Sequence, residues 1–73
     1  MFEINDVVKV LKDLEDHIQA GDSGTVVDIF DTNPPAYMIE FIDDKGRTLA
    51  APILQEKEIT LYWSAKTKTF SNN

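Results

Sequence analysis

The acidic segment around the histidine is the first place where the residue types could bind a metal. His17 is the only histidine, and the carboxylates of Asp13, Glu15 and Asp16 closely precede it. Protein metal sites combine several imidazole, thiolate or carboxylate ligands, and this chain has no second histidine and no cysteine to complete such a set. We therefore expect no metal site here and interpret His17 as a solvated loop residue.

Asp43 and Asp44 could form a carboxylate pair for acid–base catalysis. Neighbouring residues at a strand end point to opposite faces, however, so their carboxylates do not converge on one substrate. The sequence Asp43-Asp44-Lys45-Gly46 is also typical of a tight turn, in which aspartate accepts hydrogen bonds from the backbone that follows. We interpret both residues as turn residues.

The segment Gly21-Asp22-Ser23-Gly24 has the glycine content of a phosphate-binding loop. It lacks the lysine and the following helix that allow such loops to bind phosphate, so we expect no cofactor here. Ser23 has no histidine nearby in the sequence to activate it as a nucleophile. Because no nucleophile–base pair is recognisable, we expect that the protein is not an enzyme.

Length and charge exclude further classes. The chain has 73 residues, which is one domain, and its 13 acidic and 7 basic residues give a net charge of −6. Nucleic-acid binding is therefore not expected, since such proteins usually present a basic face. No apolar run approaches the ~20 residues of a membrane-spanning helix, and the acidic amino-terminal segment does not resemble a signal peptide. We expect a cytoplasmic location.

Residues 6–18 allow two interpretations. Local spacing favours a helix, with an apolar face formed by Val7, Leu11, Leu14 and Ile18. The alternative is a strand over residues 6–11 followed by an acidic loop, because the valines at positions 7, 8 and 10 favour extended backbone. Whether residues 12–19 form a loop or a helical turn stays open.

Alternating apolar residues predict strands over the rest of the chain, at residues 25–30, 36–43, 47–54 and 59–63. In the strand at residues 25–30, the predicted dry face is Thr25, Val27 and Ile29, because Asp28 marks the opposite face as wetter. In the strand at residues 36–43, the predicted dry face is Tyr37, Ile39 and Phe41. Pro52 requires an edge or a bulge in the third strand. Residues 55–58 suit a single 3-10 turn before the last strand.

Together with a strand at residues 6–11, these elements predict a mainly β fold, an SH3-like small barrel of about five antiparallel strands. The barrel is expected to occupy residues 1–63. Residues 64–73 are polar and predict a flexible tail, which only Phe70 could anchor.

Four blocks carry a resemblance: Asp6-Val7-Val8, then Ala20-Gly21-Asp22-x-Gly24-Thr25-Val26-Val27, then Ala36-Tyr37-x-Ile39-Glu40-Phe41-x-Asp43, then Gly46-Arg47-Thr48-Leu49-Ala50. They resemble a small bacterial family of unknown function, and more distantly KOW-type barrels and the barrel of the nitrile hydratase β subunit. The resemblance implies an SH3-like barrel with a strand at residues 6–11 and brings no catalytic residues. It also hints at partners in toxin–antitoxin or immunity pairs.

The strand period places Trp63 with Ile59 and Leu61, inside the barrel or capping its end, and Tyr62 outside. An exposed tyrosine and an acidic loop indicate a surface for a protein partner, formed by Asp13, Glu15, Asp16, His17, Asp22 and Tyr62. We therefore hypothesise an interaction module, the antitoxin or immunity component of a two-gene pair.

One alternative is a KOW-like nucleic-acid or ribosome-associated barrel, with Lys9, Lys45, Arg47 and Lys57 on one face. The other is an accessory domain of a larger enzyme. The sequence does not give the oligomeric state.

Overall fold

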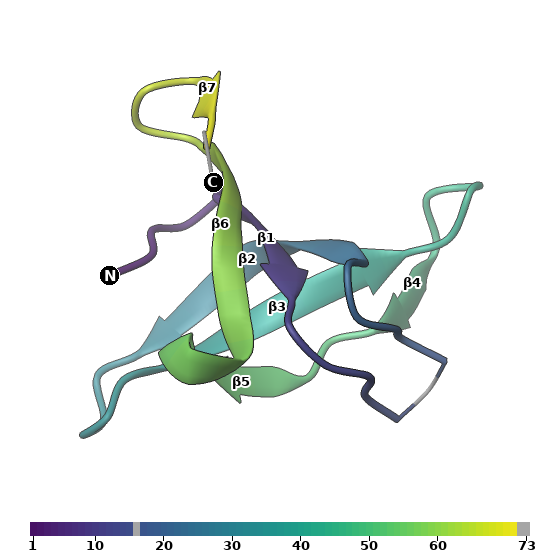
Figure 1. Cartoon of the computed structure of the whole chain (residues 1–73), viewed down its shortest axis with the longest axis horizontal. Helices are drawn as coiled ribbons and strands as arrows, with labels where there is room; N and C mark the ends of the chain where they lie inside the picture. Colours follow the sequence, from purple (N-terminus) through teal and green to yellow (C-terminus); the bar gives the residue numbers. More distant parts are fainter. Residues whose placement is uncertain (16, 72–73) are drawn as a thin grey trace.

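The computed structural model describes residues 1–15 and 17–71, and their fold is mainly β, as predicted (Figure 1). The strands are β1 (Val7–Val10), β2 (Ser23–Phe30), β3 (Ala36–Ile42), β4 (Thr48–Ala50), β5 (Ile53–Gln55), β6 (Ile59–Ser64) and β7 (Thr69–Phe70). The 3-10 turn η1 (Glu56–Glu58) lies between β5 and β6, where the sequence predicted one. No helix able to span a membrane occurs in these described ranges.

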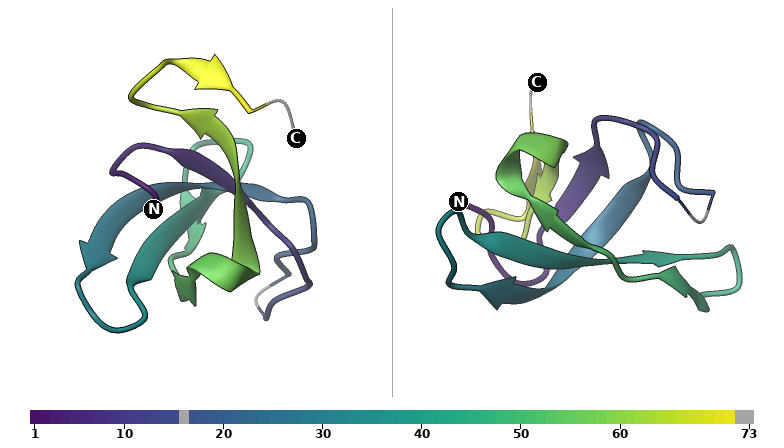
Figure 2. Two further views of the ribbon diagram at one scale, coloured as in Figure 1. Left: turned by 60° about the vertical axis from the view of Figure 1, so that its left-hand side comes forward. Right: turned by 90° about the horizontal axis from the view of Figure 1, so that it is seen from below.

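All strand pairs are antiparallel, in the order β4-β3-β2-β1-β6-β7, with β5 pairing to β3. The short strand β1 is therefore bonded on both sides, to β2 and to β6. Figure 1 and Figure 2 show β6 crossing over the β2–β3 ribbon, so that the sheet curls around its own inner face. This curling places residues from both ends of the chain against one core.

The start of the chain forms a strand, and the helix favoured by local spacing is wrong for Val7–Val10. Val8 and Val10 are buried, whereas Leu11, which a helix would have buried, is exposed. Pairing with two neighbouring strands outweighs local helical spacing, because each pairing satisfies backbone groups and buries alternate valines. After β1, residues 11–15 and 17–22 form a loop.

Strand β2 departs from the predicted alternation. Val26 is fully buried and Val27 is 40% exposed, the reverse of the predicted dry face. The register with β3 shifts between Val26 and Asp28, so Val27 is the extra residue of a β-bulge. A bulge interrupts the two-residue period, and Ile29 beyond it packs against the core again.

The core lies between the two sides of the curled sheet. The predicted dry face of β3 is confirmed, since Tyr37, Ile39 and Phe41 are all buried. The other buried apolar residues are Val8, Val10, Ile18, Val26, Leu54 and Ile59. Gly24 lets β2 approach β3 closely, because a Cβ atom at that position would lie 2.7 Å from Ile39 Cγ2.

The described part of the chain has seven strands instead of about five, and one of the two additional strands arises because the returning strand is divided. Pro52 has no amide hydrogen to donate, and the strand breaks there into β4 and β5. The Pro52 carbonyl still accepts a hydrogen bond from the Ile39 amide at 2.9 Å. Both β4 and β5 therefore remain paired with β3. The second additional strand, β7, lies in the predicted tail.

Residues 64–70 form a hairpin in which β7 pairs with Trp63 and Ser64 of β6. The sequence predicted a flexible tail, because residues 64–73 are polar and only Phe70 could anchor them. Trp63, which precedes the tail, is half-buried. Two interactions compensate: Phe70 packs on Tyr62, and the Ala65 amide donates to the buried Asp6 carboxylate at 2.8 Å. The flexibility of this segment stays a prediction.

Candidate functional site

A surface groove of about 290 Å³ separates the loop after β1 from the β3–β4 hairpin. The loop contributes His17, Ile18 and Asp22, and the first residue of β2, Ser23, follows them. The opposite wall consists of Phe41, Ile42 and Leu49. Pockets for small molecules typically enclose about 300–1,000 Å³, so this groove suits one or two side chains better than a cofactor.

Backbone hydrogen bonds fix the loop at its base. The Gly21 amide donates to the Val10 carbonyl at 2.9 Å, and the Val10 amide donates to the Asp22 carbonyl at 3.1 Å. Further out, the Leu14 amide donates to the Ile18 carbonyl at 2.7 Å, and the Ile18 side chain is buried in the core. One wall of the groove is therefore held in place before any partner binds.

Two of the predicted acidic residues hold the loop in its conformation. Asp13 Oδ1 accepts the Ala20 amide at 2.9 Å, and Asp22 Oδ2 accepts the Gln19 amide at 2.9 Å. Both side chains remain exposed, so each still contributes negative charge to the surface. Asp22 thus both closes the loop and lines the groove.

His17 lies at the mouth of the groove with a backbone φ of +66°. Its side chain is exposed and makes no hydrogen bond within residues 1–15 and 17–71. Within the same ranges no three histidine or carboxylate side chains are grouped as metal ligands. Glu15 is exposed and does not line the groove, and Asp16 lies outside the described residues.

The apolar wall was not predicted as part of a site. Ile42 and Leu49 are 56% and 59% exposed, whereas Phe41 and Ile18, which also line the groove, are buried. The β3–β4 register shifts between Phe41 and Ile42, and this shift leaves Leu49 without a partner opposite it in β3. No signal in the sequence marks that shift, so Leu49 was interpreted as an ordinary strand residue.

Tyr62 is exposed, but it is not part of the groove. Its ring makes an edge contact with Phe70 at 5.0 Å between centroids, and the Lys9 ammonium lies 4.2 Å from the Tyr62 centroid. The predicted surface therefore divides into His17 and Asp22 at the groove and Tyr62 at the β6–β7 hairpin.

Comparison with family models matches residues 4–61 to a domain of unknown function (DUF4926). The chain belongs to this family. The matched stretch includes every residue that lines the groove but ends before Tyr62 and the β6–β7 hairpin. No curated protein and no solved structure gives a significant match to the chain.

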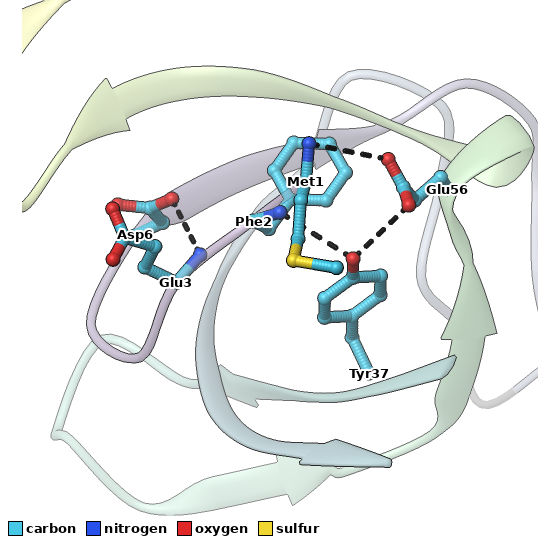
Figure 3. A network of polar contacts seen from close by, with 6 residues as sticks. All are labelled: Met1, Phe2, Glu3, Asp6, Tyr37 and Glu56. Atoms are coloured by element: carbon cyan, nitrogen blue, oxygen red, sulfur yellow. Dashed lines mark hydrogen bonds and ion pairs between the residues drawn. The ribbon is translucent and has the colours of Figure 1, made fainter. Parts of the chain in front are cut away.

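A second polar network lies at the amino terminus (Figure 3). The Tyr37 hydroxyl donates to Glu56 Oε2 at 3.1 Å and accepts the Phe2 amide at 3.4 Å, while the Met1 ammonium lies 3.5 Å from Glu56 Oε1. The Phe2 and Tyr37 rings meet edge to face with centroids 5.3 Å apart. These contacts attach the first residues of the chain to β3 and η1. We therefore interpret this network as structural.

Proposed function

We propose that this chain is a small protein–protein interaction module whose groove binds an apolar side chain from a basic segment of a partner. The observation that carries the proposal is the pair Ile42 and Leu49, which line the groove and are both more than half exposed. Covering them removes apolar surface from water, and fully burying such a side chain contributes about 1.5–3 kcal/mol.

The charge of the loop supports a basic partner. Asp13, Glu15 and Asp22 are exposed beside or near the groove, and the chain carries a net charge of −6. Lys12, at the base of the loop, is paired with Glu58 at 3.7 Å. Negative potential at this face would accelerate the approach of a cationic segment, and salt would weaken the effect.

We infer an SH3-like barrel from the long loop between β1 and β2, from η1 before β6, and from the pairing of β1 with both β2 and β6. The family resemblance supports a cytoplasmic antitoxin or immunity component that binds its partner without catalysis. An acidic module of this kind would suit a basic toxin.

The KOW-like alternative needs its basic residues free and on one face. Arg47 Nε is bonded to Asp43 Oδ2 at 3.0 Å, and Lys9 lies over the Tyr62 ring. These contacts favour the protein-binding proposal. The third hypothesis, an accessory domain of a larger enzyme, stays a prediction.

A peptide titration tests the groove. A short labelled peptide that alternates lysine with leucine should bind at low salt and shift the amide resonances of Ile42 and Leu49. Leu49→Ser should weaken binding about tenfold, because it removes the apolar contact without changing the net charge. Ile53→Ser is the matched control, since Ile53 is also 56% exposed but lies outside the groove. Equal binding by both variants, or no binding at low salt, would sink the proposal.

A further inference from the structure

The β6–β7 hairpin differs in charge from the rest of the chain. Residues 59–73 contain Lys66 and Lys68 and no acidic residue, a formal charge of +2. Residues 1–58 contain all thirteen acids and five bases, a formal charge of −8. Figure 1 shows the hairpin projecting from one end of the molecule, away from the loop that precedes β2. The protein therefore presents a small basic surface remote from its acidic loop.

Exposed aromatic rings accompany these lysines. Tyr62 and Phe70 are 38% and 61% exposed and touch edge to face. The Lys9 ammonium lies 4.2 Å above the Tyr62 ring, a distance typical of a cation–π contact. This contact brings a third cation to the hairpin surface.

The hairpin is fixed by hydrogen bonds at both of its ends. The Ala65 amide donates to Asp6 Oδ1, the Lys68 amide donates to the Ser64 carbonyl at 2.7 Å, and the Ser71 amide donates to the Tyr62 carbonyl at 2.8 Å. A two-stranded hairpin alone is marginally stable, so the bond from Ala65 to Asp6, which reaches the body of the protein, helps to maintain it. The lysines and rings are thus presented on a preformed support.

The outer edge of β7 is unpaired in the described structure. In the strand order β7 comes last and pairs with β6 alone. Such an edge can accept an additional strand through main-chain hydrogen bonds, while side-chain contacts provide specificity.

We propose that the β6–β7 hairpin binds an extended acidic segment of a partner protein. Carboxylates of that segment meet Lys9, Lys66 and Lys68, and an apolar side chain covers Tyr62 and Phe70.

An acidic peptide fits this surface better than single-stranded nucleic acid does. Exposed rings and lysines are common to both kinds of site. Nucleic-acid binding usually requires several phosphate contacts on a broad basic face, and here three lysines belong to a chain of net charge −6. A free strand edge adds main-chain pairing that only a polypeptide can use.

A fluorescence anisotropy titration at low salt tests the inference with a labelled peptide that alternates glutamate with valine. We expect saturable binding, with amide resonance shifts confined to Lys9 and residues 62–70. Replacing Lys66 and Lys68 by glutamine should weaken binding about fivefold or more, since two exposed charge pairs are lost. Replacing Lys45 and Lys57 by glutamine is the matched control: both are exposed, the loss of charge is the same, and they lie outside the hairpin. That control variant should bind like the wild type.

Two further measurements separate this inference from the groove. Leu49→Ser should leave binding of the glutamate peptide unchanged, whereas Phe70→Ser should weaken it. Protection of the Ala65 amide from hydrogen exchange in Phe70→Ser would show that the hairpin is retained. The inference is overturned if the glutamate peptide does not bind or if oligothymidylate binds more tightly. It is also overturned if the Lys66/Lys68 and Lys45/Lys57 double variants weaken binding equally, or if sedimentation shows that the hairpin associates with a second copy.

Discussion

The carboxylate of Asp6 accepts the Ala65 amide at 2.8 Å across 59 residues of sequence. Its other oxygen accepts the Glu3 amide at 2.9 Å, and the residue is buried. One carboxylate therefore connects the amino-terminal segment, the start of β1 and the β6–β7 hairpin.

Asp6→Ala should destabilise the protein by about 3 kcal/mol, because two backbone donors lose a charged acceptor in a buried site. Urea unfolding followed by circular dichroism measures this loss as a lower midpoint with an unchanged slope. Asp44→Ala is the control, since Asp44 is exposed and should change stability by less than about 0.5 kcal/mol. Equal midpoints for the two variants would show that Asp6 has no such role.

The predictability of β2 and β3 differed for a physical reason. Tyr37, Ile39 and Phe41 alternate without interruption, and their burial followed directly from a two-residue period. In β2 the bulge at Val27 shifts that period by one residue, so Val26 is buried instead. A bulge is set by how two strands meet and has no marker in this local sequence, so the alternation could not show it.

Gly24→Ala tests the close approach of β2 to β3. A Cβ atom there would meet the Ile39 side chain at 2.7 Å and the Glu40 carbonyl at 2.9 Å, and the backbone oxygen has little room to move. Overpacking of this kind costs about 1–3 kcal/mol, which thermal or urea unfolding would detect. Ser23→Ala, at the exposed neighbouring position, should unfold like the wild type. A wild-type midpoint for Gly24→Ala would mean that the strands separate more easily than this contact implies.

Asp43 makes the stability of the β3–β4 turn dependent on pH. The Arg47 amide, then the Lys45 amide and the Arg47 guanidinium, hold the pKa of Asp43 below its ordinary value of 3.8. A lowered pKa in the folded state contributes stability above the ordinary value, and this contribution is lost as the pH falls through the folded pKa. Asp43→Asn should therefore be less stable than wild type at neutral pH, and the difference should shrink as the pH falls below the ordinary pKa of 3.8. Urea unfolding measures this difference, and the control Asp44→Asn should show no such trend with pH. A stability difference between Asp43→Asn and the wild type that stays constant with pH would contradict this role of Asp43.

The candidate site was only partly predictable from the sequence. His17 and Asp22 were found because charged residues in a loop are visible in the sequence, and both line the groove. Leu49 and Ile42 were missed, because their exposure depends on the register shift between β3 and β4. Tyr62 was grouped with the acidic loop because sequence alone does not place the hairpin, and the structure brings it to Lys9 and Phe70.

The Tyr37 hydroxyl links the amino-terminal segment to η1, and the pH dependence of stability can measure this link. Burial, and next the hydrogen bond to Glu56, raise the pKa of Tyr37 above its ordinary value of 10.0, against the opposing hydrogen bond from Phe2. Because the unfolded chain then loses this proton first, the folded state loses stability as the pH rises above 10.0. Tyr37→Phe should remove this alkaline loss and, at neutral pH, destabilise the protein by about 1 kcal/mol through its missing hydrogen bonds. Urea unfolding of both proteins at neutral and alkaline pH tests this, with Tyr62→Phe as the control for general alkaline effects. Parallel stability curves for wild type and Tyr37→Phe would show that the hydroxyl does not couple the amino terminus to η1.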